Sequence, residues 1–140
     1  MKIKSMKVNL TIGIFVSAFI LTAASCTKND SATANPVAAR AIKFVLYTEK
    51  DFSSENDSIT FSLFIKTHTK TLFDSSLPAM RIKDIPTTAN KLIIDKKVPN
   101  DDGTDLQIGF RYAIQNVGYS WYLDSCKTGT TNKTVNFSFQ

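Results

Sequence analysis

The feature that most constrains this fold is an alternation of apolar and polar residues that begins near residue 40 and continues to the end of the chain. The alternation is longest at 106–114, where every second residue is apolar. Successive side chains of a β-strand point to opposite faces, so a period of two predicts half-buried strands. Shorter runs of the same kind occur at 42–46, 59–65, 80–82, 92–94, 119–123 and 135–139.

Turn-forming residues separate these runs, as in Pro99-Asn100-Asp101-Asp102-Gly103. No segment of ten or more residues shows a helical period. The sequence therefore predicts an all-β domain, a small antiparallel β-sandwich of about seven strands with immunoglobulin-like or transthyretin-like topology. An immunoglobulin domain proper would pair two cysteines around a central tryptophan, and that pattern is missing, so the label concerns architecture only.

The first 25 residues have the three parts of a secretory signal. Three lysines precede an apolar stretch from Leu10 to Leu21, and Thr22-Ala23-Ala24-Ser25 supplies small residues before a cleavage site. The apolar stretch is shorter than the ~20 residues that a transmembrane helix needs, which makes a membrane-spanning anchor the weaker alternative.

The residues before Cys26 resemble a bacterial lipobox, Leu21-Thr22-Ala23-Ala24-Ser25-Cys26, although Ala23 stands where a leucine is usual. The resemblance implies that Cys26 is lipidated and becomes the mature N-terminus, and that the protein is anchored in the outer membrane, on either its periplasmic or its extracellular face. It predicts three parts: a signal peptide at 1–25, the lipidated cysteine with a flexible tether at 26–39, and the β-sandwich at 40–140. The whole is similar to small Gram-negative lipoproteins with a single β-sandwich domain. Ordinary cleavage after Ser25 is the alternative.

Charge and cysteine content exclude some functions. Of 17 basic residues, three lie in the leader, which leaves 14 against 12 acidic ones and a net charge of +2. Nucleic-acid binding is not expected from such a balance. Lipidation of Cys26 would leave Cys126 without a partner, and a buried apolar environment is then expected for it.

One acidic loop contains carboxylates that resemble calcium ligands. Asp101, Asp102 and Asp105 could supply oxygen atoms, but Val98 breaks the EF-hand spacing, and a polar hairpin turn is the favoured interpretation. A single histidine, His68, cannot form the usual zinc or catalytic clusters. We therefore expect no cofactor and no enzyme activity.

Aromatic residues provide the second candidate site. Tyr119 and Trp121 share one face of the strand at 119–123, and Tyr122 lies on the other face. The commoner arrangement would place Trp121 in the core and Tyr122 beneath a loop. If exposed together, such rings can stack on sugars or anchor a protein.

The expected function is that of a lipid-anchored envelope protein, attached to the membrane, with a binding or structural accessory role. Two alternatives are a carbohydrate-binding module that uses Tyr119, Trp121 or Tyr122, and an adhesin or assembly subunit that pairs through its strand edges. The corresponding partner is a glycan or another envelope protein.

Overall fold

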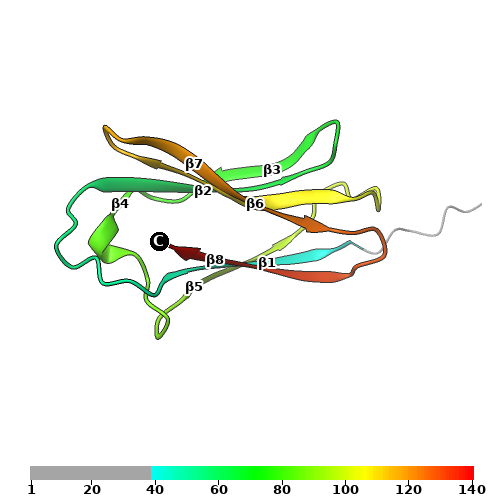
Figure 1. Ribbon diagram of the computed structural model, residues 1–140. Helices are drawn as coiled ribbons and strands as arrows, with labels where there is room; N and C mark the ends of the chain where they lie inside the picture. Colours follow the sequence, from blue (N-terminus) through cyan, green and yellow to red (C-terminus); the bar gives the residue numbers. More distant parts are fainter. Residues whose placement is uncertain (1–38) are drawn as a thin grey trace, which may run out of the picture. The chain divides into compact units, whose positions relative to one another are not determined.

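The alternating segments fold into two packed β-sheets in the computed structural model, which describes residues 39–140 (Figure 1). The all-β prediction is confirmed. Within these residues the strands are β1 (Ala41–Thr48), β2 (Ser58–Lys66), β3 (Thr71–Ser76), β4 (Met80–Arg81), β5 (Leu92–Lys97), β6 (Leu106–Ile114), β7 (Gly118–Cys126) and β8 (Asn132–Phe139), and a 3-10 turn lies at Ile82–Asp84.

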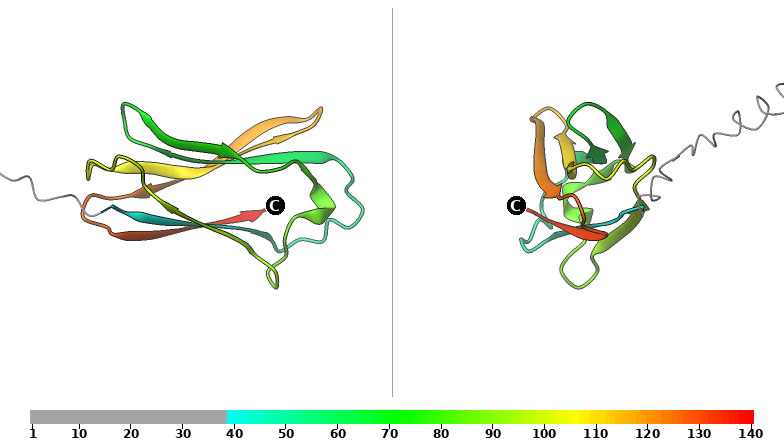
Figure 2. Two further views of the ribbon diagram at one scale, coloured as in Figure 1. Left: turned by 180° about the vertical axis from the view of Figure 1, so that it is seen from behind. Right: turned by 90° about the vertical axis from the view of Figure 1, so that its right-hand side faces the viewer.

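The smaller sheet has the strand order β5-β1-β8, and the larger one has the order β3-β2-β6-β7 with β4 also paired to β2. All pairs are antiparallel except β1 and β8, which run parallel from Ala41↔Asn132 to Thr48↔Phe139. Figure 2 shows the two sheets as separate layers. In an immunoglobulin domain the first two strands share a sheet, whereas here β1 and β2 lie in different sheets. The strand order thus differs from that of an immunoglobulin domain.

The core consists of the inward residues of both sheets and is rich in phenylalanine. Phe137 of β8 stacks on Phe110 at 5.3 Å between ring centroids and on Tyr112 at 5.7 Å, both in β6 of the opposite sheet. Phe61 of β2 meets Phe139 edge-on at 6.0 Å. Such aromatic pairs contribute about 0.5–1.5 kcal/mol each beyond the burial of their area. The two sheets are therefore joined by an aromatic layer.

The sequence analysis did not predict strand β3. β3 contains adjacent Leu72 and Phe73 instead of an alternation, and its residues are exposed or only half-buried. Its pairing with β2 is also interrupted by a register shift between Ile65 and Lys66. A strand that contributes little to the core has no reason to show a clear period of two.

Gly109 lies where β7 comes too close to β6 to leave space for a side chain. It pairs with Leu123, and a Cβ atom built on it would overlap the carbonyl oxygen of Tyr122 and lie 3.3 Å from the Cα of Leu123. These neighbours are backbone atoms and cannot rotate away. Only glycine fits at this position without displacing β7.

We predict that Gly109→Ala destabilises the domain by about 1–3 kcal/mol, the range typical of overpacking at a site that cannot relax. The free energy of unfolding, measured by urea denaturation, tests this. Gly129→Ala is the matched control: nothing lies within 4 Å of its Cβ position, so only the strain of its positive φ of 82° is introduced. A loss of less than about 0.5 kcal/mol at Gly109 would contradict the close-approach argument.

Candidate functional site

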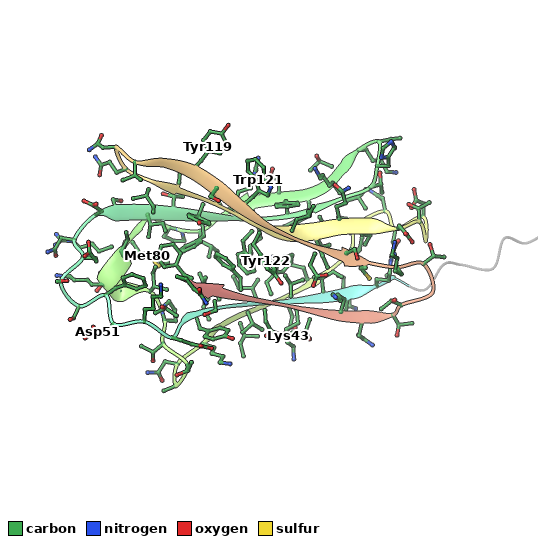
Figure 3. All side chains as sticks on the ribbon, viewed as in Figure 1. Lys43, Asp51, Met80, Tyr119, Trp121 and Tyr122 are labelled. Atoms are coloured by element: carbon green, nitrogen blue, oxygen red, sulfur yellow. The ribbon has the colours of Figure 1, made fainter. Side chains whose placement is uncertain are left out.

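Two aromatic rings stand side by side on the outer face of the larger sheet. Tyr119 and Trp121, two residues apart on β7, are 79% and 62% exposed. Their ring centroids are 6.2 Å apart and their planes differ by 27°. Both point away from the smaller sheet (Figure 3). We call this pair the aromatic platform.

Tyr122 belongs to the core and not to this platform. It lies between the sheets in Figure 3, with its ring 5.3 Å from that of Phe137. The interpretation that placed Trp121 in the core was wrong, because the alternation of β7 directs odd-numbered residues outward and Tyr122 inward. Of the three aromatic candidates, the fold therefore brings Tyr119 and Trp121 together and places half-buried Tyr122 on the opposite face, against the core.

A shallow hollow of about 460 Å³ adjoins the platform on the same face. Arg111 of β6 pairs in register with Trp121 and forms an ion pair with Asp74 of β3. Phe64 of β2 forms part of the lining yet is only 7% exposed. Lys66 Nζ and the Arg111 guanidinium lie 5.7 Å and 6.0 Å from its ring centroid and cover it.

The hollow has a simple structural origin. In the cross-strand row that contains Leu123 and Phe64, the middle position is Gly109, which has no side chain. Phe64 and Leu123, which both line the hollow, therefore stand on either side of a position without a side chain. Sequence analysis identified the aromatic residues of β7 but not Arg111, Asp74 or Lys66. These residues lie on the polar side of their strands, and only the register of four strands brings them beside Trp121.

The acidic loop is held together by cations of the protein itself. Asp101 accepts hydrogen bonds from Arg40 Nε at 2.8 Å and from Arg40 Nη2 at 2.5 Å, and both side chains are almost fully buried. These bonds lower the pKa of Asp101 to about 2. Arg40 precedes β1, so the pair fixes the loop after β5 to the beginning of the domain.

The other two carboxylates of this loop have partners of their own. Asp102 accepts hydrogen bonds from the amide and hydroxyl of Thr104. Asp105 accepts from Lys127 Nζ, at 2.8 Å, and from Thr128, and the lysine is the main cause of a pKa lowered to about 2. Among residues 39–140, no three acidic, histidine or cysteine side chains are grouped as metal ligands. The structure thus does not bring Asp101, Asp102 and Asp105 into one calcium site.

The remaining candidates are placed as follows. His68 lies in the hairpin between β2 and β3. Cys126 is a free thiol, 1% exposed, as expected for a residue that packs with the core. Cys26 and the tether up to residue 38 lie outside the described residues. Two further hollows, of about 370 and 530 Å³, are lined mainly by loop residues and contain no residue of the aromatic platform.

No family model matches the chain, and no curated protein or solved structure shows significant similarity to it. Within the described range, no helix is long and apolar enough to cross a membrane. The aromatic platform with its adjoining hollow is therefore the candidate site that rests on geometry.

We predict that Asp101→Asn destabilises the domain by about 3–5 kcal/mol, because the buried Arg40 loses its counter-charge. Asp102→Asn, at an exposed position of the same loop, is the control and is expected to change stability by about 0.5 kcal/mol or less. Urea denaturation at pH 7 measures both values. Equal effects of the two substitutions would contradict a structural role for the buried pair.

The same ion pair predicts how acid affects stability. The folded-state pKa of Asp101 is about 2, below the ordinary value of 3.8. Its contribution is therefore present above about pH 4 and is lost as the pH falls towards 2. The Asp101→Asn variant should lose less stability over this interval than the wild type, and an identical decline in both proteins would refute the assignment.

Proposed function

We propose that this chain is a lipid-anchored, non-enzymatic protein of the outer membrane that binds carbohydrate on the outer face of its larger sheet. The observation that carries the proposal is the aromatic platform, two large rings that are exposed while most other aromatic residues of the domain pack in the core. Exposed apolar surface of this kind commonly marks a binding site.

The geometry of the platform favours sugars as the ligand. The rings of Tyr119 and Trp121 are nearly parallel and follow one strand, so that they present two adjacent π-faces. Such faces attract the C–H groups on the apolar side of a sugar ring. The Tyr119 hydroxyl and the Trp121 indole N–H offer hydrogen bonds at the rim.

Polar groups beside the platform would hold the hydroxyl groups of the sugar. Arg111 and Asp74 form an exposed ion pair in the hollow, with a donor and an acceptor side by side. In the row that contains Trp121 and Arg111, Ser62 and Ser76 share a hydrogen bond of 2.8 Å between their hydroxyls. A surface that combines flat apolar rings with such pairs fits a carbohydrate better than it fits a purely apolar partner.

The anchor is supported by the sequence of the leader. A basic segment, an apolar segment and small residues before Cys26 form the pattern of a lipoprotein signal. Burial of acyl chains contributes about 0.8 kcal/mol per CH₂, so several chains would hold the protein at the membrane. A domain tethered in this way would keep a glycan close to the cell envelope.

An assembly or adhesin role is the second candidate. It requires a free strand edge, and β7 supplies one, because it is the terminal strand of the larger sheet.

We predict that Trp121→Ala weakens glycan binding by roughly ten- to a hundredfold, since truncation of a central aromatic binding residue costs about 2 kcal/mol. Tyr119→Ala should also weaken glycan binding, but by a smaller factor. Binding is measured on a broad panel of neutral and acidic oligosaccharides, first to identify a ligand for the wild type and then by titration with that ligand.

Tyr47→Ala is the control for these substitutions. Tyr47 lies on β1 of the other sheet, with Lys91 Nζ 4.0 Å from its ring centroid, and its loss should leave affinity unchanged. Circular dichroism confirms that each variant is folded. A wild type that binds no member of the panel, or a Trp121→Ala variant with unaltered affinity, would refute the sugar-binding proposal.

We predict that the protein extracted from the membrane of a Gram-negative host begins at Cys26 and carries the mass of attached acyl chains. Intact-mass spectrometry measures this, and Cys26→Ser is the control, which should lose the added mass. A chain that begins at Cys26 without added mass would contradict lipidation, and Cys26 could then pair with another thiol.

A further inference from the structure

The strand that bears the aromatic platform has a free edge. β7 pairs only with β6, in an unbroken register from Leu106↔Cys126 to Ile114↔Gly118. No strand in the part of the chain that the structure describes pairs with its other side. Backbone N–H and C=O groups along this edge are consequently available to another strand.

The other terminal strands have features that oppose such pairing. Three of the six residues of β5 are charged: Asp95, Lys96 and Lys97. β3 is only six residues long, is offset from β2 by a register shift, and is followed by Pro78. The outward residues of β8 are all polar: Asn132, Thr134, Asn136 and Ser138. The charged edge of β5 and the short, interrupted edge of β3 discourage association, and the outward side chains of β8 offer a partner strand no apolar contact.

β7 lacks these features over most of its length. It is nine residues long and contains neither lysine nor proline. Its single charge, Asp124, is neutralised by Lys133 of β8 at 2.9 Å. The outward residues before it are Tyr119, Trp121 and Leu123, all at least 50% exposed. An extended edge whose outward residues are apolar up to Leu123, and whose one charge is already paired, gains from association with another strand.

We propose that β7 pairs antiparallel with β7 of a second copy of this chain, with Trp121 on the twofold axis. The free segment from Gly118 to Asp124 has Trp121 at its centre, so this register uses its whole length. It places Trp121 opposite Trp121 of the second copy, and Tyr119 opposite Leu123 in two equivalent pairs. Every outward apolar residue of the segment then meets an apolar residue, and cross-strand pairs of this type stabilise sheets. The twofold arrangement closes on itself as a dimer.

The pairing would double the proposed binding surface. A twofold axis perpendicular to the joined sheet leaves both aromatic platforms on the same face, where they adjoin. Each copy contributes two rings to one continuous strip, which would suit a longer glycan chain. This consequence rests on the proposed glycan binding, whereas the pairing itself rests only on the edge of β7.

Disulfide cross-linking of the full chain in the envelope of a Gram-negative host tests the pairing. Residues directly opposite on antiparallel strands have Cα atoms roughly 4.5–5.5 Å apart, which suits a disulfide bond. Trp121→Cys should give a covalent dimer on a non-reducing gel, at least several times more abundant than in controls. The wild type reports any background from Cys26 and from the buried Cys126.

Two controls separate specific pairing from random collision at a membrane. Lys43→Cys places an exposed thiol on the opposite face of the sandwich (Figure 3) and should cross-link only at the collision level. Tyr119→Cys and Leu123→Cys should each fail to cross-link alone, yet form a mixed dimer when two differently tagged chains are expressed together. This cross-pairing is the signature of the proposed register.

Trp121→Cys that cross-links no more than Lys43→Cys would overturn the proposal, and so would strong self-linking of Tyr119→Cys. Neither result depends on a glycan, so failure of the dimer is distinguishable from failure of sugar binding. A second measurement guards against local distortion by the new thiol. A chain with Trp121→Lys should capture little of its own variant, and the same holds for a chain with Trp121→Glu. The two variants should capture one another well, because their charges are opposite. The absence of this difference would also refute the pairing.

Discussion

The arrangement of the two sheets depends most on the packing of the Phe137 ring. It belongs to the last strand, in the smaller sheet, and lies within 5.3–6.3 Å of Phe61, Phe110, Tyr112 and Tyr122 of the larger sheet. Because successive side chains of a strand point to opposite faces, the residues that alternate with this inward aromatic layer must lie on the surface. The exposure of Tyr119 and Trp121 follows from the inward orientation of Tyr122, which comes directly after Trp121 on β7.

Gly109 links this packing to the candidate site. The backbone of β7 comes so close to β6 at this point that no side chain fits, and the resulting gap separates Leu123 from Phe64 on the outer face. One close approach thus accounts both for the fit of β7 against β6 and for the low middle of the hollow beside the platform. Strand pairing and surface shape have the same cause here.

The carboxylates of the acidic loop resemble calcium ligands in the sequence, but in the structure they bind groups of the protein itself. Asp101 sits in a run of carboxylates typical of cation binding, and the cation it meets is the guanidinium of Arg40, 61 residues away in the sequence. Asp105 likewise holds Lys127 and Thr128, which ties the loop before β6 to the loop after β7. The loop therefore connects distant segments of the chain at one end of the sandwich.

The alternation of apolar residues by itself determined the all-β class, most of the strands and the opposite orientation of Trp121 and Tyr122, because a strand has only two faces. It did not reveal β3, which contributes too little to the core to need a regular pattern. Nor could it decide which face of β7 is buried, since both carry aromatic residues and the choice depends on packing against β8. Only the tertiary structure set Arg111, Asp74 and Lys66 beside the platform and paired Arg40 with Asp101. Those neighbours come from different strands and loops, and their proximity depends on register and sheet order, which no local pattern of residues encodes.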